Sequence, residues 1–441
     1  MKKERIKSIL LIMLIITNLV LAEKILVNEK LWLSGYNFFV STRNNKKKNI
    51  ASVTESLTMP EKIIVNTGYQ SSRFIYTRYN EYFSNLLDTT SGIVKSAFLS
   101  AKSAFEIGAD DWYSALTAKS LYLSYHCSFS TDTFANFLGV SVQELPDIEF
   151  SDIVIGENGN VYLGGKERYF KIPVSSSQIS PIIQAVSTEH ADEESIINYS
   201  FDLNFDQTSG DGTTVLSPMI LIYSEPIRAF TAIPQNPAER NGQLAERQLY
   251  GVLPVFGVNK SSARSYTEAD GTLVYVENNG ILKITPSGIL SFTARGNGIK
   301  LQGNSASSEI AAFIDSVNSQ MDIDTDICLI LAEISDSSAH FEFDYIVEGY
   351  PVKYTDKHAI SITVSNGYLT EYSQILRHFD ITENESYSSD FIQALDNTII
   401  AYRDSLYETR ITNMYPAFID DFSAEEIGID WNIEVDNILA E

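Results

Sequence analysis

The chain has 441 residues and is 44% hydrophobic and 11% aromatic, a composition that allows several packed cores and excludes a disordered chain. Of its 32 basic and 57 acidic residues, ten and three lie in residues 1–48, which leaves 22 basic and 54 acidic residues in the remainder. A body this acidic is repelled by nucleic acid, so the composition disfavours nucleic-acid binding.

The first predicted element is an apolar helix from Ile9 to Ala22, which has no charged residue. A basic cluster, Lys2 to Lys7, precedes it, and such a cluster stays in the cytoplasm while the following chain crosses the membrane. We therefore predict a cytoplasmic head and a single transmembrane helix in residues 1–22, with an extracytoplasmic body after it.

The same segment has features of a cleaved signal peptide. A helix over residues 8–22 is about 22 Å long, shorter than a bilayer core of about 30 Å. A small-residue cleavage site ends at Ala22. Conversely, Ile25 to Val27 extend the apolar character, and the side chains of Glu23 and Lys24 can reach the headgroups of a retained span. The residues themselves leave cleavage and retention equally open.

One face of the predicted membrane helix is a candidate partner contact. Leu11, Ile15, Asn18 and Ala22 share this face at spacings of four, three and four residues. An intramembrane Asn can hydrogen-bond a neighbouring helix, which contributes about 1 kcal/mol. The alternative is that Asn18 lies near the outer interface of a short span.

The exported part is predicted to contain a stalk and three domains. Residues 23–59 form the stalk, in which the basic sequence RNNKKK starts at Arg43. An N-terminal α/β domain follows in residues 60–174. A middle α+β domain in residues 175–304 and a C-terminal α+β domain in residues 305–441 complete the body.

The N-terminal domain is predicted to start with a buried strand at residues 62–66. Apolar spacings of three and four predict helices at residues 74–87 and 92–105. Alternation of apolar and polar residues predicts a strand from Leu121 to Phe129 with one buried face. A short capped helix at residues 131–138 and a hairpin at residues 150–163 follow.

The rest of the body alternates between helices and strands. In the middle domain we predict a helix at residues 182–186, strands at 196–205 and 215–223, and a loop from Pro234 to Arg247. In the C-terminal domain we predict a helix at residues 307–321, strands at 327–334 and 341–347, and a last helix at 390–407.

Two stretches resemble each other: GTLVYVENNGILKITPSGILSFT from Gly271 and VEGYPVKYTDKHAISITVSNGYLTEY from Val347. Gly271 corresponds to Gly349, and Gly288 corresponds to Gly367 after a one-residue insertion. In both stretches a glycine precedes a strand, and a Ser-Gly or Asn-Gly turn leads into the last strand. This repeat predicts two related units built on antiparallel sheets.

The sequence contains no recognised catalytic motif. The five histidines lack metal-ligand spacing, and there is no nucleophile elbow, dinucleotide-binding loop or P-loop. Asp322, Asp324, Asp326 and Glu333 match four positions of a calcium loop, but Ile327 occupies the place of its required glycine. We therefore expect no enzymatic activity, no metal and no cofactor, and predict a protein that acts by contact.

The two cysteines, Cys127 and Cys328, are expected to be buried thiols rather than a disulfide because each lies in an alternating or apolar run. So few cysteines in an exported chain are typical of a bacterium that does not rely on disulfides outside the cell.

The basic head MKKERIKSILLIMLIITNLVLA, the stalk, the N-terminal domain and the two related units resemble the YycH family, and the repeated stretch is similar to a unit that YycH shares with YycI. The resemblance implies a single-pass cell-membrane protein of low-GC Gram-positive bacteria. Such a protein regulates WalK (YycG), a sensor histidine kinase that controls cell-wall metabolism, together with a YycI-type protein. The resemblance carries over no catalytic residue and favours a retained anchor.

Two other classes of function remain open. A secreted binding protein for a cell-wall component or a small ligand requires cleavage after Ala22. An enzyme requires a cleft that joins a His with an Asp or Glu from distant parts of the chain.

Overall fold

The computed structural model describes residues 52–438 apart from these segments: 69–71, 81, 102, 143–144, 166–167, 175–178, 191–196, 204–213, 225, 241–242, 302–305, 336, 388–389 and 403–407. The predicted membrane helix and residues 23–51 of the predicted stalk lie outside the described residues. Residues 52–59 of the predicted stalk are described and contain helix α2 (Val53–Ser56), with Val53 and Leu57 in the core. Among the helices that are described, none combines the length and apolarity of a membrane span.

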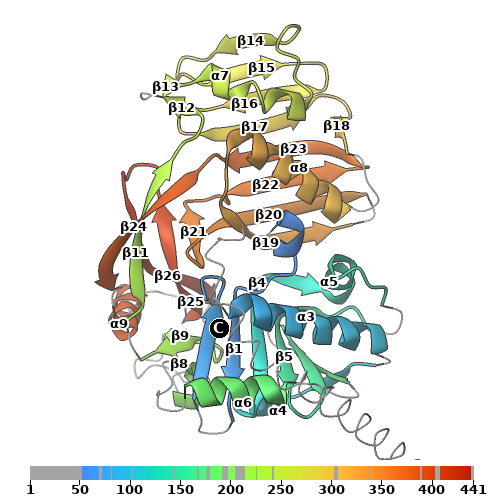
Figure 1. Cartoon of the computed structure of the whole chain (residues 1–441), viewed down its shortest axis with the longest axis vertical. Helices are drawn as coiled ribbons and strands as arrows, with labels where there is room; N and C mark the ends of the chain where they lie inside the picture. Colours follow the sequence, from blue (N-terminus) through green and yellow to red (C-terminus); the bar gives the residue numbers. More distant parts are fainter. Residues whose placement is uncertain are drawn as a thin grey trace, which may run out of the picture.

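Two sheets organise the molecule. A seven-stranded sheet with helices on its faces forms one end, and a fifteen-stranded sheet extends from it to the opposite end (Figure 1). The pairings within the first sheet are all antiparallel, and antiparallel pairs predominate in the second. The predicted mixture of α and β structure on antiparallel sheets is confirmed, and the predicted N-terminal α/β domain is itself of the α+β kind.

The seven-stranded sheet contains the strand that was best defined by its sequence pattern. Leu121, Leu123, Tyr125, Cys127 and Phe129 are all buried, as their alternation predicts. In spatial order the strands are β2 (Arg73–Thr77), β1 (Lys62–Asn66), β4 (Ser120–Ser130), β5 (Glu149–Gly156), β6 (Asn160–Gly164), β7 (Tyr169–Pro173) and β3 (Phe105–Ile107).

Helices cover both faces of this sheet because its buried side chains point to both sides. One face packs against α3 (Phe83–Ser100), α5 (Thr131–Phe137) and α6 (Ser180–Glu189). The other packs against α4 (Ala109–Thr117) and a small sheet of β8 (Ile197–Tyr199) and β10 (Leu221–Tyr223), with η2 (Ser200–Leu203) after β8. The predicted boundary after residue 174 therefore precedes elements that join the cores of the N-terminal sheet.

One stretch of the N-terminal domain differs from its prediction. Residues 74–87 and 92–105 were expected to form two helices, whereas the structure has strand β2 and the single helix α3. Phe74 and Tyr76 are both buried and alternate along β2, so this short stretch satisfied a period of two as well as helical spacing. Gly92 lies within α3, where the space beside it is open, and it does not end the helix.

The fifteen-stranded sheet joins strands from distant parts of the chain. Its main path is β14 (Arg264–Thr267), β15 (Leu273–Val276), β16 (Gly280–Ile284), β17 (Ile289–Ala294), β23 (Tyr368–Ile375), β22 (Ile360–Ser365), β20 (Ser338–Val347), β21 (Tyr350–Tyr354), β25 (Glu408–Asp420), β26 (Ile427–Ile438), β11 (Arg228–Gln235) and β24 (His378–Tyr387). Off this path lie β18 (Ile299–Lys300), β19 (Asp326–Ile334) and β9 (Thr214–Leu216).

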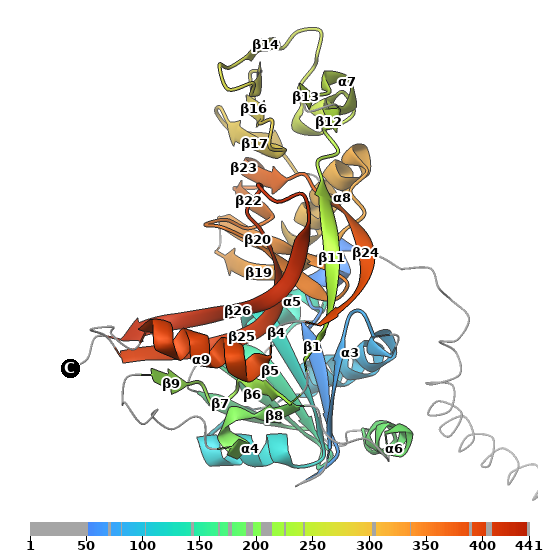
Figure 2. The same ribbon diagram turned by 90° about the vertical axis from the view of Figure 1, so that its left-hand side faces the viewer.

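Smaller elements accompany this sheet. They are α2 (Val53–Ser56), β12 (Glu239–Arg240), β13 (Gln243–Leu244), α7 (Glu246–Leu249), η3 (Leu253–Phe256), α8 (Ala306–Met321) and α9 (Phe391–Tyr402). Figure 2 shows that β25 and β26 curve away from the rest of the sheet together with α9. Phe391, Met414 and Trp431 form a third core there with residues of β9 and β10. The predicted last helix is therefore followed by a long hairpin that the sequence pattern did not reveal.

The predicted repeat is present in its hairpins. Gly271, Gly288, Gly349 and Gly367 have φ angles of +89°, +84°, +84° and +76°, a region that side chains rarely adopt, so each turn depends on glycine. Hairpins β16–β17 and β22–β23 meet along the antiparallel pair β17–β23. The preceding strands differ, because β15 pairs with β16 whereas β21 pairs with β20 and β25.

An aromatic cluster lies beneath the β17–β23 pair. Phe256 lies 5.6 Å from Phe292, 5.3 Å from Phe313 and 5.4 Å from Tyr372, measured between ring centroids. These rings come from η3, β17, α8 and β23. The predicted boundary between residues 304 and 305 thus falls between segments that share one sheet and one aromatic core.

We predict that Phe256→Ala destabilises the hairpins on both sides of this boundary, by about 3–5 kcal/mol, because the large ring leaves a cavity in a shared core. Hydrogen exchange of the full-length protein should show β15–β16 and β22–β23 losing protection together. Phe105→Ala is the control, since this Phe is 55% exposed. Loss of protection confined to β15–β17 would contradict a shared core.

Candidate functional site

Charged side chains that are buried or partly buried gather where the two sheets meet, an arrangement that we call the junction. Glu61 and His126 come from the N-terminal domain, and Asp344, Lys353 and His358 come from the large sheet. In sequence, Glu61 precedes β1 and His126 lies on β4, which packs against β19. The junction therefore combines groups that are far apart in the chain.

Asp344 is the centre of the junction on the side of the large sheet. Its side chain is 1% exposed, and its two carboxylate oxygens lie 2.9 Å from Lys353 Nζ and 2.9 Å from His358 Nδ1. Burial alone raises the pKa of a carboxyl group, but the hydrogen bond from His358 and the charge of Lys353 hold the pKa of Asp344 below its usual value. Asp344 is thus an ionised carboxylate with two cationic partners.

Glu61 is the corresponding carboxylate of the N-terminal domain. It lies 3.1 Å from Lys62 Nζ and 3.7 Å from His126 Nδ1. Burial opposes its ionisation, but the charge and hydrogen bond of Lys62 and the charge of Lys353 keep the pKa of Glu61 lowered. Lys353 belongs to the large sheet, and its charge also lowers the pKa of Asp344. It therefore acts on a carboxylate of each domain.

The pKa of His126 is shifted in the opposite direction from the pKa of His358. Burial is the main cause of the lowered pKa of His126, and the charge of Lys353 adds to the effect. The pKa of His358 is raised, chiefly by its hydrogen bond to Asp344. At neutral pH the junction therefore favours a neutral His126 and extends protonation of His358 to higher pH.

Two further contacts hold the domains together around these charges. Arg78, which follows β2, donates a hydrogen bond of 2.6 Å from Nη1 to the carbonyl oxygen of Ile327 at the start of β19. The neighbouring Tyr79 packs edge-on against Phe230 of β11, with 5.4 Å between ring centroids. A Cβ on Gly349, in the turn between β20 and β21, would lie 3.0 Å from Tyr79 Cβ, so this turn approaches the N-terminal domain closely.

The described chain also begins at the junction. Ser52 and Glu55 form a reciprocal capping box at the start of α2, with hydrogen bonds of 2.9 and 3.3 Å. Helix α2 then packs against α8 and β19. Since β19 also packs against β4 of the N-terminal domain, the described chain begins beside the place where the two sheets meet.

A second buried ion pair lies at the turn end of the long hairpin of β25 and β26. Arg377 Nε lies 3.3 Å from the carboxylate of Asp420, and both side chains are buried. Arg377 Nη1 also donates a hydrogen bond of 2.9 Å to the carbonyl oxygen of Ser287. Since Ser287 lies in the turn between β16 and β17, this guanidinium joins the two related hairpins to β25.

The acids that resemble a calcium loop are dispersed. Asp322 lies in a left-handed turn with φ of +54° after α8, and Asp324 pairs with His378 at 2.6 Å. Asp326 starts β19 and Glu333 lies near its end, as the predicted strand requires. Within the described part of the chain, no three potential metal ligands gather at one point.

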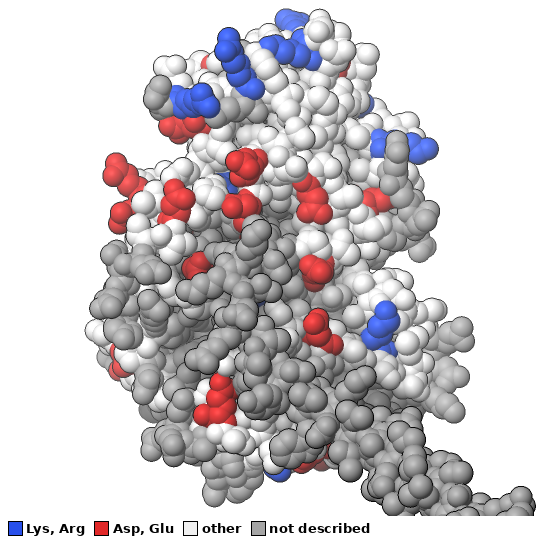
Figure 3. All heavy atoms as spheres, viewed as in Figure 1, with Lys and Arg blue, Asp and Glu red and all other residues white. Residues whose placement is uncertain are grey.

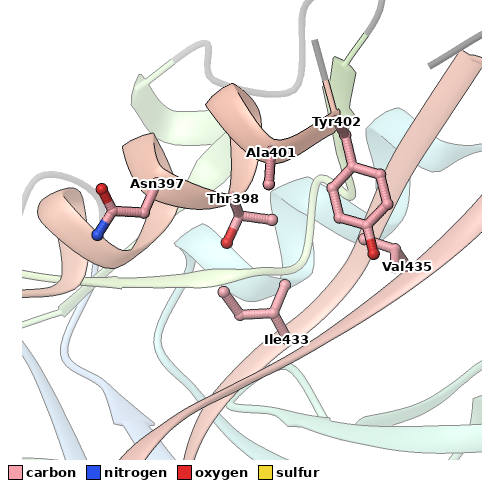
Figure 4. A pocket seen from close by; sticks show the side chains of 6 residues that line it. All are labelled: Asn397, Thr398, Ala401, Tyr402, Ile433 and Val435. Atoms are coloured by element: carbon pink, nitrogen blue, oxygen red, sulfur yellow. The ribbon is translucent and has the colours of Figure 1, made fainter. Parts of the chain in front are cut away.

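A groove between α9 and β26 has a volume of about 290 Å³. Figure 4 shows side chains from the helix and from the strand around it. The lining residues are uncharged: Asn397, Thr398, Ala401, Tyr402, Ile433 and Val435. Its described lining thus offers apolar surface without the convergent charged groups of a catalytic site.

Sequence reasoning placed the functional contact elsewhere. The predicted partner face of Leu11, Ile15, Asn18 and Ala22 lies outside the described residues. The junction was missed because its residues are distant in sequence, and its histidines were expected to be ordinary. One signal was available: Asp344 occupies a buried register between Phe343 and Tyr345, and a charge in an apolar strand requires a partner.

The overall fold resembles that of known proteins. YycH from Bacillus subtilis matches with a TM-score of 0.56 and 11% identity, over 88% of this chain and 97% of that chain. An uncharacterized protein from Eubacterium rectale matches with a TM-score of 0.35 and 10% identity, over 53% of this chain and 85% of that one. The C-terminal domain of YpeB from Bacillus megaterium matches with a TM-score of 0.25 and 11% identity, over 45% and 89%.

No protein-family model and no curated protein matches the sequence. The structural match to YycH from Bacillus subtilis confirms the predicted resemblance at the level of the fold.

We predict that Asp344→Asn destabilises the full-length protein by about 3–5 kcal/mol, because Lys353 and His358 lose the carboxylate that compensates their charges. Urea unfolding measures this loss. The matched control is Glu425→Gln, which removes one negative charge from an exposed position and should change stability by less than about 0.5 kcal/mol. Equal stabilities of the two variants would contradict a structural role for the buried carboxylate.

The raised pKa of His358 predicts a pH-dependent contribution to stability. The contribution is fully present below about pH 6.5, the ordinary pKa of His, and is lost as the pH rises through the raised pKa. Relative to wild type, His358→Gln should lose about 1–2 kcal/mol at pH 5.5 and less at pH 8.5. Unfolding measured at both values tests this difference, and a loss that is the same or grows toward pH 8.5 would contradict it.

Proposed function

We propose that this chain is a membrane-anchored, extracytoplasmic regulator of a two-component sensor histidine kinase that controls cell-wall metabolism, and that it acts by protein contact rather than by catalysis. The observation that carries the proposal is the fold likeness to YycH, which covers 88% of this chain and 97% of that one. A basic head followed by an apolar segment adds support, because this order is the one expected of an N-terminal anchor.

In this proposal the partners are a kinase of the WalK (YycG) type and a YycI-type protein. The helix of residues 9–22 contacts the kinase within the membrane, and the exported body makes further contacts outside. The described body begins with α2, which packs against α8 and β19. In this proposal the chain that leads from the membrane therefore reaches the body beside the large sheet.

The physical mechanism is a shift between two states of the kinase. A regulator whose helix packs better against one state changes the ratio of the states only through that difference in affinity. A difference of about 1.4 kcal/mol changes the ratio tenfold. Contacts of one helix are sufficient for this, since a single interhelical hydrogen bond contributes about 1 kcal/mol.

The test is a double substitution on the predicted partner face, Asn18→Leu with Ile15→Ala, in a strain that reports the expression of kinase-controlled genes. We expect reporter output to change severalfold while the amount and thermal stability of the body stay unchanged. The control places two substitutions, Met13→Ala and Val20→Leu, on the opposite side of the same helix. Unchanged output in the first strain, or the same change in both strains, would contradict regulation through this face.

A further inference from the structure

The charge of the body reverses at the end farthest from the N-terminal sheet. Residues 228–300 contain eight Lys or Arg and five Asp or Glu, whereas the other residues after position 48 contain 14 and 49. Figure 3 shows the blue side chains gathered over the part of the molecule formed by β14 and its neighbours, and red ones over the middle. We call this end the basic tip and define it as residues 228–300, which run from β11 through β14 to β18.

Most cations of the basic tip are exposed to solvent. Six of them are exposed: Arg240, Arg247, Lys260, Arg264, Arg295 and Lys300. Among the described residues of the tip, Lys283 and Glu268 form an ion pair at 2.9 Å. Lys260, Arg264 and Arg295 form no ion pair with any described acidic side chain. No ion pair with a described residue therefore offsets the charge of these three side chains.

Strand β14 ends the large sheet within this tip. It pairs with β15 on one side, and no described strand pairs with its other side. All four of its residues are exposed. A strand in this position presents a row of backbone donors and acceptors to solvent, which is a template for another strand.

The register shows which backbone groups face outward. Glu268 N donates to the carbonyl oxygen of Thr272 at 2.8 Å, so Glu268 and Thr272 are a hydrogen-bonded position where the hairpin of β14 and β15 closes. Pairs alternate along an antiparallel ladder, so Tyr266 and Arg264 are also bonded to β15. The N–H and C=O groups of Ser265 and Thr267 then point away from the sheet.

The side chains of β14 add selectivity to this edge. Arg264 and Tyr266 share one face of the strand, since side chains alternate. Tyr266 is 47% exposed and offers an aromatic surface beside the guanidinium. Arg295 lies toward the same end as Arg264, because its N–H donates to the carbonyl oxygen of Asn279 in the turn that follows β15.

We propose that the free edge of β14 binds an extended acidic segment of a partner protein by strand addition. The segment adds a strand to the sheet through the N–H and C=O groups of Ser265 and Thr267. Its acidic side chains lie against Arg264 and its neighbouring cations, and an apolar side chain contacts Tyr266. This surface does not depend on the identity of the kinase or on a retained anchor.

Other occupants fit the edge less well. A second copy of β14 would place two basic tips against each other, and like charges across a pair of strands are destabilising. An anionic lipid surface satisfies the cations but offers no regular row of backbone partners to Ser265 and Thr267. The combination of an unpaired edge with unpaired cations therefore favours an acidic peptide.

The probe is an eight-residue fluorescein-labelled peptide, Glu-Thr-Val-Thr-Glu-Thr-Val-Thr, which places Glu and Val in turn along one face of an added strand. It is titrated with the full-length protein in detergent and followed by anisotropy. Ser265→Pro removes an outward N–H without touching the ladder to β15, and it should weaken binding about tenfold, the loss expected for about 1.4 kcal/mol. Ser265→Ala keeps the N–H and should bind within about twofold of wild type. Arg264→Glu should weaken binding and reduce its dependence on salt.

A second probe keeps the protein unchanged. The same peptide with alternate amides N-methylated, made in both registers, retains its charge but loses one bonding edge, so strand addition predicts weaker binding for one register than for the other. Equal binding of both N-methylated peptides and the unmodified one would show attraction by charge alone and overturn the proposal. Absence of binding, or binding only to vesicles of phosphatidylglycerol, would also overturn it.

Discussion

An ionised carboxylate with 1% of its side chain exposed, that of Asp344, is the constraint on which the shape of the body depends. A buried charge is tolerated only when cations and hydrogen bonds compensate it. Lys353 and His358 meet this requirement from β21 and from the loop that precedes β22. The hairpin of β20 and β21 must therefore close as it does, and its turn at Gly349 is then held against Tyr79 of the N-terminal domain.

The same charges couple the two sheets electrostatically. Lys353 acts on Glu61 as well as on Asp344, and the positive charges around His126 disfavour its protonation. The backbone contact of Arg78 with Ile327 spans the same boundary. Helix α2 packs against α8 and β19, and β19 in turn packs against β4 of the N-terminal domain. The described chain therefore begins beside the place where the two sheet domains meet.

Local patterns were sufficient for most strands and helices, because alternation in β4 and turn glycines such as Gly288 act over a few residues. The predictions that failed are informative. β2 was predicted as helix because five residues fit both periods, and pairing with β1 decided between them. The junction was invisible because only the fold brings Glu61 near Lys353. The long hairpin of β25 and β26 likewise acquires its apolar partner, α9, from tertiary packing. The predicted membrane face remains a prediction, since it lies outside the described residues.

The account rests most heavily on a retained N-terminal anchor. The most direct measurement is the intact mass of the native protein isolated from the membrane fraction of a Gram-positive host. Regulation through a membrane helix predicts a mass that includes residues 1–22, with the protein remaining in the membrane fraction after a high-salt wash. A mature chain that begins at Glu23 and is recovered outside the membrane would contradict it, and would favour a secreted binding protein instead.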